Sequence, residues 1–239
     1  MGWLEDIGKS LPIEKIYDDL ARKSVVQVGD IALNSIKAAR CILAPIDYLA
    51  AQQDKLQNHL KRVNDKVPEN RQINAHPLLT GPIIDNLKYV EEESLISEMF
   101  ENLLARAIDR ERASEAHPAF SKIIAQLSPD EAVILYHFKN QSYEAELNYI
   151  YAPNFEYINS IEILKNQFPV ELLTFPNNYI MYLNHLCHLN LLTQFNNMLH
   201  MKESSPYNQK RCIETTKTTT FGQLFSQACI PEKTDLFKT

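Results

Sequence analysis

Apolar residues recur every three or four positions through much of the first 140 residues, the spacing of amphipathic helices. Residues 11 to 40 carry such a stripe and are predicted to form a helix. Pro45 is expected to break or kink the run, and a second helix should follow, with Leu49, Leu56, Leu60 and Val63 on one face. Three prolines, one glycine and three asparagines then predict a connector over residues 64 to 82.

Residues 91 to 112 give the clearest helical pattern. Three glutamates open the segment and three arginines close it, which suits the helix dipole at both ends. The predicted buried face recurs with a period of 3.6 residues. It comprises Leu95, Ile96, Met99, Phe100, Leu103, Leu104, Ala107 and Ile108.

The stretch HPAFSKIIAQLSPDEAVILYHF, residues 117 to 138, predicts two helix starts. Pro118 and Pro129 each suit the first position of a helix, where a missing N–H costs nothing. Ser128 and Glu131 are spaced as a capping box, in which each side chain satisfies the other's backbone N–H. Asp130 adds negative charge to the first turn. This structural interpretation is preferred over a catalytic pair formed by Asp130 and Glu131.

The last hundred residues change character. Residues 176 to 192 predict a helix, residues 192 to 201 a strand, the β-branched run CIETTKTTT a second strand, and FGQLFSQACI a closing helix. This order suggests a winged-helix module. We therefore expect a mainly α protein, with an N-terminal helical region at 1–65, a central helical domain at 66–127 and a small winged-helix-like α+β domain at 128–239.

Composition narrows the class of protein. Only five glycines argue against nucleotide-binding folds with glycine-rich loops. Four widely spaced cysteines and no signal peptide predict reduced thiols in the cytoplasm. Charged residues interrupt the apolar interval 25–51, so it should not span a membrane. A core helix of this same protein is preferred for it, with the inner-membrane surface or a partner helix as alternatives.

Two patterns raise the question of chemistry. Arg112 and His117 have the R-x4-H spacing of a class of helical ribonucleases, in which the histidine acts as acid or base and the arginine stabilises phosphate charge. Pro118 argues that His117 caps a helix, whereas that class has both residues on one helix. His185, Cys187, His188 and His200 invite a metal interpretation, but no second ligand pair has a familiar spacing. We expect no metal and no cofactor.

A winged helix also raises the question of DNA binding. Residues 166 to 200 contain no lysine or arginine, and the net charge is −6, whereas nucleic-acid binding depends on cationic contacts to phosphates. The candidate contacts are all in the strand region: Lys202, Lys210, Arg211 and Lys217. A protein partner or self-association is therefore preferred, with a membrane surface as an alternative and nucleic acid behind both.

Several segments together resemble a known family. VPENRQIN, GPIIDNLKYVEEESLISEMFENLLARAIDRE, AHPAFSKIIAQLSPDEAVIL, LCHLNLL and TTFGQLFSQACI are similar to the bacterial abortive infection alpha proteins, over about two-thirds of the chain. The motif-matching residues are His117, Pro118, Phe120, Ser128, Pro129, Asp130 and Glu131. The family pattern has proline at the position of His76 and glycine at that of Asn190.

The resemblance implies a role in defence against phage, by halting or killing the infected cell, and supplies no catalytic mechanism. We expect a non-enzymatic interaction or effector module whose N-terminal helices self-associate or contact the membrane. A ribonuclease using Arg112 and His117, and a winged-helix DNA-binding regulator, are the alternatives.

Overall fold

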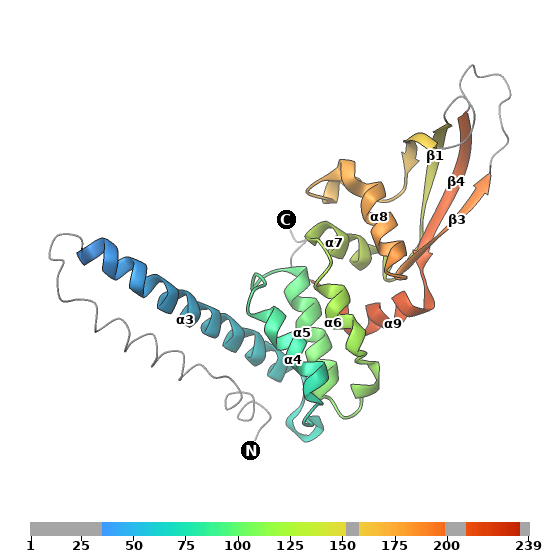
Figure 1. Cartoon of the computed structure of the whole chain (residues 1–239). Helices are drawn as coiled ribbons and strands as arrows, with labels where there is room; N and C mark the ends of the chain where they lie inside the picture. The colour runs from blue at the N-terminus through green and yellow to red at the C-terminus, as the bar shows by residue number, and fades with distance from the viewer. Residues whose placement is uncertain (1–34, 152–157, 199–208, 235–239) are drawn as a thin grey trace. The chain divides into compact units, whose positions relative to one another are not determined.

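The computed structural model describes residues 35–151, 158–198 and 209–234 (Figure 1). The chain divides into two compact units. Unit 1 holds the described residues of Met1–Glu93 together with Phe100–Ser121. Unit 2 holds Ser94–Met99 and the described residues of Lys122–Thr239. The division into three parts expected from the sequence stays a prediction.

Unit 1 is helical. Its elements are α3 (Ser35–Lys66), η2 (Glu69–Arg71), α4 (Pro77–Leu87), most of α5 (Leu95–Ile108), η3 (Ala113–Glu115) and the start of α6 (Pro118–Ile124). Its apolar core includes Leu56, Leu60, Val63, Ile83, Leu87, Phe100, Leu103, Leu104 and Phe120, all at most 8% exposed. The helical periodicity around residues 56–63 and 95–108 therefore predicted the buried faces correctly, apart from the half-buried Ile96.

The N-terminal part of unit 1 differs from expectation. α3 runs through Pro45 as one helix, so the break expected there is wrong, and the alternative of a kink stays a prediction. The first predicted helix, at residues 11 to 40, lies largely outside the described residues. The expected connector at 64 to 82 contains the start of α4, whose first turn is capped by His76. Within the described ranges, no helix combines the length and apolarity needed to cross a membrane.

Unit 2 contains α7 (Pro129–Phe138), α8 (Tyr179–His188) and α9 (Thr220–Cys229), with the short turns η4 (Val170–Leu172) and η5 (Pro176–Asn178). Its sheet is built from β1 (Tyr143–Tyr151), β2 (Ile158–Asn166), β3 (Leu192–Met198) and β4 (Gln209–Thr218). All neighbours are antiparallel, in the order β2-β1-β4-β3. Figure 1 shows α8 beside this sheet.

This sheet corrects the predicted fold class. The two strands expected near 192–201 and 212–220 exist as β3 and β4, but β1 separates β4 from β2, and the result is a four-stranded sheet rather than a wing. The described chain is mixed α+β, not mainly α, and it shows no winged helix. β1 and β2 were missed because neither alternates cleanly: β1 buries adjacent residues Leu147 and Asn148, and the described side chains of β2 are nearly all exposed. The DNA-binding regulator that rested on a winged helix loses its basis.

The closing helix α9 is fixed by one close approach. A Cβ on Gly222 would lie 2.0 Å from the carbonyl oxygen of Leu191, so only glycine fits there. Thr219 caps α9 by accepting from the Gly222 N–H at 2.8 Å. Asn190, the residue before Leu191, has φ 58°. This is the left-handed conformation that glycine adopts most easily, and glycine is the residue that the family pattern has at this position.

Candidate functional site

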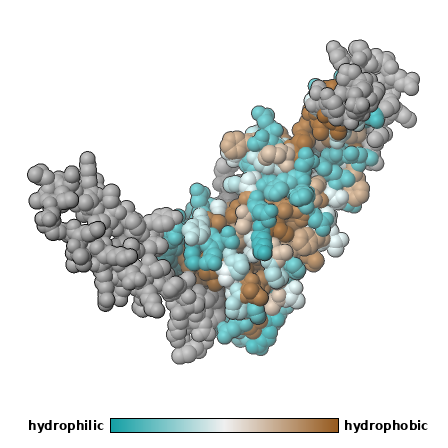
Figure 2. Space-filling view, in the orientation of Figure 1, coloured by the Kyte–Doolittle hydropathy of each residue, from teal (hydrophilic) through white to brown (hydrophobic). Residues whose placement is uncertain are grey.

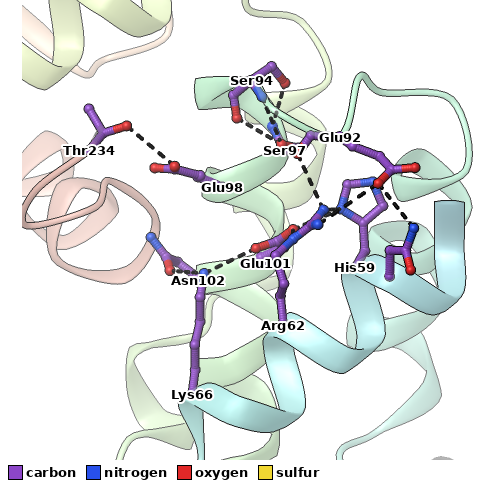
Figure 3. Close-up of polar contacts among 11 residues, drawn as sticks. His59, Arg62, Lys66, Glu92, Ser94, Ser97, Glu98, Glu101, Asn102 and Thr234 are labelled. Atoms are coloured by element: carbon purple, nitrogen blue, oxygen red, sulfur yellow. Dashed lines mark hydrogen bonds and ion pairs between the residues drawn. The ribbon is translucent and has the colours of Figure 1, made fainter. Parts of the chain in front are cut away.

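Unit 1 contains a buried ionic cluster centred on Glu101 of α5 (Figure 3). Its side chain is only 2% exposed. Three side chains of α3 converge on it: His59 Nδ1 lies 2.8 Å from Oε1, Arg62 Nε donates to Oε1 at 2.7 Å, and Lys66 Nζ donates to Oε2 at 3.2 Å. Both carboxylate oxygens are therefore engaged.

The helix explains how α3 supplies all three partners. Residues 59, 62 and 66 are spaced three and four apart, and such residues share one face of a helix. Arg62 also reaches Glu92, donating from Nη2 to its backbone oxygen at 3.3 Å. Asn58 donates to the Glu92 carboxylate at 3.1 Å. The cluster thus fastens α3 both to α5 and to the segment before it.

The cations determine the charge state of Glu101. Burial by itself raises the pKa of this carboxyl, but hydrogen bonds from His59 and Arg62 and the charge of Lys66 outweigh burial, and the net shift of its pKa is downward. The ionised form of Glu101 is therefore favoured, with Arg62 and Lys66 as its cationic partners.

His59 occupies a constrained position in this cluster. Its Nδ1 lies between the Glu101 carboxylate and Arg62 Nη2, 2.9 Å away. Its Nε2 is buried and has no hydrogen-bond partner in the described part of the chain. The residue is 0% exposed, so no reactant can reach the ring in this conformation. The arrangement suits an ionic lock between helices better than acid–base catalysis.

The LSPDEA motif lies in unit 2, and its capping box is confirmed. Ser128 Oγ accepts from the Glu131 N–H at 3.3 Å, and Glu131 Oε2 accepts from the Ser128 N–H at 2.8 Å. Pro129 is the first residue of α7, as predicted.

Asp130 does more than the sequence indicated. Its oxygens accept from the N–H groups of Thr174 and Phe175 at 2.8 and 2.9 Å, and from the Tyr182 hydroxyl at 3.1 Å. Burial raises the pKa of Asp130, but these hydrogen bonds outweigh it and lower the pKa overall. The residue clamps the loop before α8 and anchors α8 itself.

Glu131 also uses its second oxygen. Oε1 lies 2.6 Å from His185 Nδ1 on α8, so the capping residue of α7 holds a neighbouring helix as well. Across the described residues, no three histidine, cysteine or acidic side chains are grouped closely enough to hold a metal. His200, the last histidine of the metal hypothesis, lies outside the described residues.

Arg112 and His117 belong to different local structures. Arg112 precedes η3 and forms a two-pronged hydrogen bond to Glu115, at 2.9 and 2.8 Å. His117 precedes α6, where its Nδ1 accepts from the Ala119 N–H at 3.1 Å and its ring lies 5.5 Å from that of Phe120. The shared helix that the ribonuclease pattern requires is absent here.

His117 has a counterpart that the sequence repeats. In the earlier tripeptide Ala-His-Pro, His76 accepts from the Leu78 N–H at 3.2 Å and Pro77 begins α4. Two helices of unit 1 therefore start with the same histidine cap followed by proline, and the repeat is explained by capping.

The predicted cationic contacts do not share one face of the sheet. Lys210 and Arg211 are consecutive in β4 and so point to opposite faces. Lys210 lies over the Tyr151 ring at 5.2 Å, and Lys217, on the same face as Arg211, lies over Phe195 at 4.6 Å. Lys202 lies outside the described residues.

Besides Glu131, unit 2 holds another buried glutamate, which sequence reasoning missed. Glu214 of β4 is 5% exposed and is hydrogen-bonded by two neutral groups: Gln194 Nε2 donates to Oε1 at 2.7 Å and the Tyr149 hydroxyl to Oε2 at 3.3 Å. Burial raises the pKa of Glu214, and the Tyr149 hydrogen bond offsets this only in part.

The two thiols near Glu214 have raised pKa values. Burial raises the pKa of Cys187 on α8 to about 11, and the nearby carboxylate adds to the shift. Cys212, which is more fully buried than Cys187, has a raised pKa for the same reasons. The cysteines whose side chains the structure describes, at 187, 212 and 229, are free thiols. Thiolate chemistry at this cluster is therefore disfavoured.

The sequence model for abortive infection alpha matches residues 51–229. The match covers well over half of the chain, which belongs to this family, and the resemblance predicted from the sequence motifs is confirmed. No curated protein and no solved structure is significantly similar to the chain. Membership supports a role in abortive-infection defence against phage.

Proposed function

We propose that this member of the abortive infection alpha family acts in phage defence as a non-enzymatic effector or interaction module. Its N-terminal helices would self-associate or contact the membrane, and protein contacts rather than catalysis would carry the response. No cofactor takes part in the proposed action.

The observation that carries the proposal is how the motif residues are used. Ser128 and Glu131 cap α7, Asp130 clamps residues 174–175, and His117 caps α6. Each polar motif group is engaged in holding helices and a loop in place. Because the family motif stabilises the fold, it favours a protein that acts through binding surfaces and not through a catalytic site.

The first experiment is a phage challenge of cells that express this chain alone, at low and high multiplicity of infection. Survival at low multiplicity with collapse at high multiplicity is the expected result. Protection in which individual infected cells survive would contradict the abortive mechanism. Fractionation and mass measurement test the mode of action: a stable oligomer or membrane-bound protein is expected, and a soluble monomer would argue against it.

The ribonuclease remains the competing hypothesis, and one pair of variants separates it from capping. Asparagine is a good helix cap but cannot act as an acid or base. His117→Asn should keep protection if His117 caps α6, whereas His117→Ala should weaken the fold. Loss of protection in His117→Asn and Arg112→Ala, both with melting temperatures like the parent's, would favour the ribonuclease. His76→Asn is the matched control, because it changes the same kind of cap at α4.

A further inference from the structure

β2 forms one edge of the sheet in unit 2. The strand order places β1 on one side of it and no strand on the other within the described ranges. The outer backbone groups of an edge strand can pair with another chain. The question is whether the side chains of β2 prevent such pairing or favour it.

The exposed side chains of β2 are unusually apolar. Ile158, Ile161, Ile163 and Leu164 are 46%, 36%, 39% and 40% exposed. Figure 2 shows hydrophobic side chains gathered near the outer end of the sheet. Single exposed aliphatic residues are ordinary, but four within seven positions of an edge strand mark a contact surface.

A bulge in β2 gives this edge a specific charge pattern. Glu162 pairs with Asn148 of β1, and Lys165 pairs with Glu146, with a register shift between Ile163 and Lys165. Glu146 and Asn148 are two apart in β1 and so share a face. Glu162 and Lys165 therefore also share a face, although they are three residues apart.

From this geometry we propose that β2 is the docking edge for a second copy of this chain. The two β2 strands run antiparallel about a two-fold axis between Ile163 and Leu164. Glu162 then lies opposite Lys165 of the second copy, and the reciprocal pair forms on the other side of the axis. Opposed residues of neighbouring strands must share a face, and the bulge alone makes this pairing possible.

The surroundings of the two charges fit this role. Lys165 Nζ is 3.7 Å from Glu146 with 82% of its side chain exposed, so it is free to turn toward a partner. Glu162 is steadied by Asn148 Nδ2, which donates to it at 3.0 Å. A two-fold pairing uses the same edge on both copies and therefore closes as a dimer instead of growing by open-ended strand addition. The inference goes beyond the proposed function: it places self-association at β2 of unit 2, which leaves membrane contact as the role of the N-terminal helices.

Charge exchange in the full-length chain tests the proposal, with the mass measured by light scattering or sedimentation. The wild type should be a dimer. Glu162→Lys and Lys165→Glu should each place like charges opposite one another twice and weaken the dimer by roughly tenfold or more. The double variant restores opposite charges and should dimerise nearly as well as the wild type. Glu171→Lys, an exposed acid outside β2 with the same change in charge, is the control and should dimerise normally.

A monomeric wild type would overturn the inference, as would single variants that dimerise like the double. The phage challenge on the same variants separates this from the proposed function. A monomeric wild type that still protects leaves the defence role intact and removes the β2 interface. A monomeric Glu162→Lys variant that still protects supports the interface but shows that defence does not need it.

Discussion

Two glutamates, one in each unit, are nearly equally buried yet have opposite electrostatic settings. Glu101 is 2% exposed and is met by His59, Arg62 and Lys66, whereas Glu214 is 5% exposed and is met by the neutral groups of Gln194 and Tyr149. The pKa of Glu101 is lowered and that of Glu214 is raised. Burial does not decide the charge of a carboxyl group; the groups it meets decide whether burial is outweighed.

The contributions of these two glutamates to stability should therefore change with pH in opposite directions. Because the pKa of Glu101 is lower in the folded state, its stabilising effect is present above the pKa of an unfolded glutamate and is lost as pH falls through the folded value. Because the pKa of Glu214 is higher in the folded state, its contribution is fully present below the unfolded value and is lost as pH rises through the folded one. A falling pH weakens the contribution of Glu101, and a rising pH weakens that of Glu214.

The largest effect is expected from Glu101→Ala. Removing the anion leaves Arg62, Lys66 and the buried His59 without their shared partner, which should cost about 3–5 kcal/mol of unfolding free energy. Urea unfolding followed by circular dichroism measures it. Glu93→Ala, an exposed position nearby, is the control and should change stability by less than about 0.5 kcal/mol. Equal, small losses in both variants would show that the cluster contributes no net stability.

Replacing the other glutamate should have the opposite sign. Glu214→Gln keeps the shape but cannot ionise; its amide oxygen can still accept from Gln194 Nε2, and its NH2 group can donate to the Tyr149 hydroxyl in place of accepting from it. It should therefore stabilise the protein at pH 8 by about 1 kcal/mol, the usual size of a stabilising substitution. At pH 4 the difference should disappear. Thermal melts of both proteins across this range are the measurement, and a constant difference at all pH values would contradict the raised pKa of Glu214.

The difference between the two glutamates should disappear if Glu214 is given a cationic partner like those of Glu101. Gln194→Lys puts an ammonium where Gln194 now donates to Oε1, so the pKa of Glu214 should fall and the loss of stability with rising pH should vanish. We expect a gain of less than about 1 kcal/mol at pH 8, because desolvation of the lysine offsets much of the attraction. Gln194→Met is a matched control without charge. An unchanged pH profile in the lysine variant would show that the new cation stays in solvent.

The smallest effect concerns the rim of the Glu101 cluster. The Lys66 side chain is 35% exposed, so solvent screens its attraction to Glu101, and Lys66→Gln should cost no more than about 0.5 kcal/mol. Isothermal urea curves in low and high salt measure the contribution, which should shrink further in salt. A loss close to that of Glu101→Ala would mean that Lys66 is as essential as the buried members.

Local signals carried most of what the sequence predicted. The capping box at Ser128 and Glu131, the proline helix starts and the periodic face of α5 each depend on residues within one or two turns, and all are present. β2 escaped prediction because an exposed edge strand has no buried alternate positions to produce a period of two. The winged-helix interpretation failed for the same reason, since without β1 and β2 the remaining strands resemble a wing.

The ionic cluster depends on contacts between residues some 40 positions apart, which no local pattern reveals. One signal was available. Leu56, His59, Leu60 and Val63 follow the i, i+3, i+4, i+7 spacing of a single helix face, so His59 stood at a core position. A histidine in an apolar stripe indicates a buried partner, although the sequence does not name Glu101 as that partner. The β-branched run around Glu214 predicted the strand β4, but it did not predict that β4 lies between two other strands of the sheet.

The turn from Ser128 to Glu131 holds three structures at once: the start of α7, the 174–175 loop and α8. Its opening should therefore be cooperative. In native-state hydrogen exchange, the amides of Thr174 and Phe175 should become exposed together with the amide of Glu131, as one unit of shared opening free energy. Four consecutive residues of the family motif would then set how readily this whole corner of the molecule loosens.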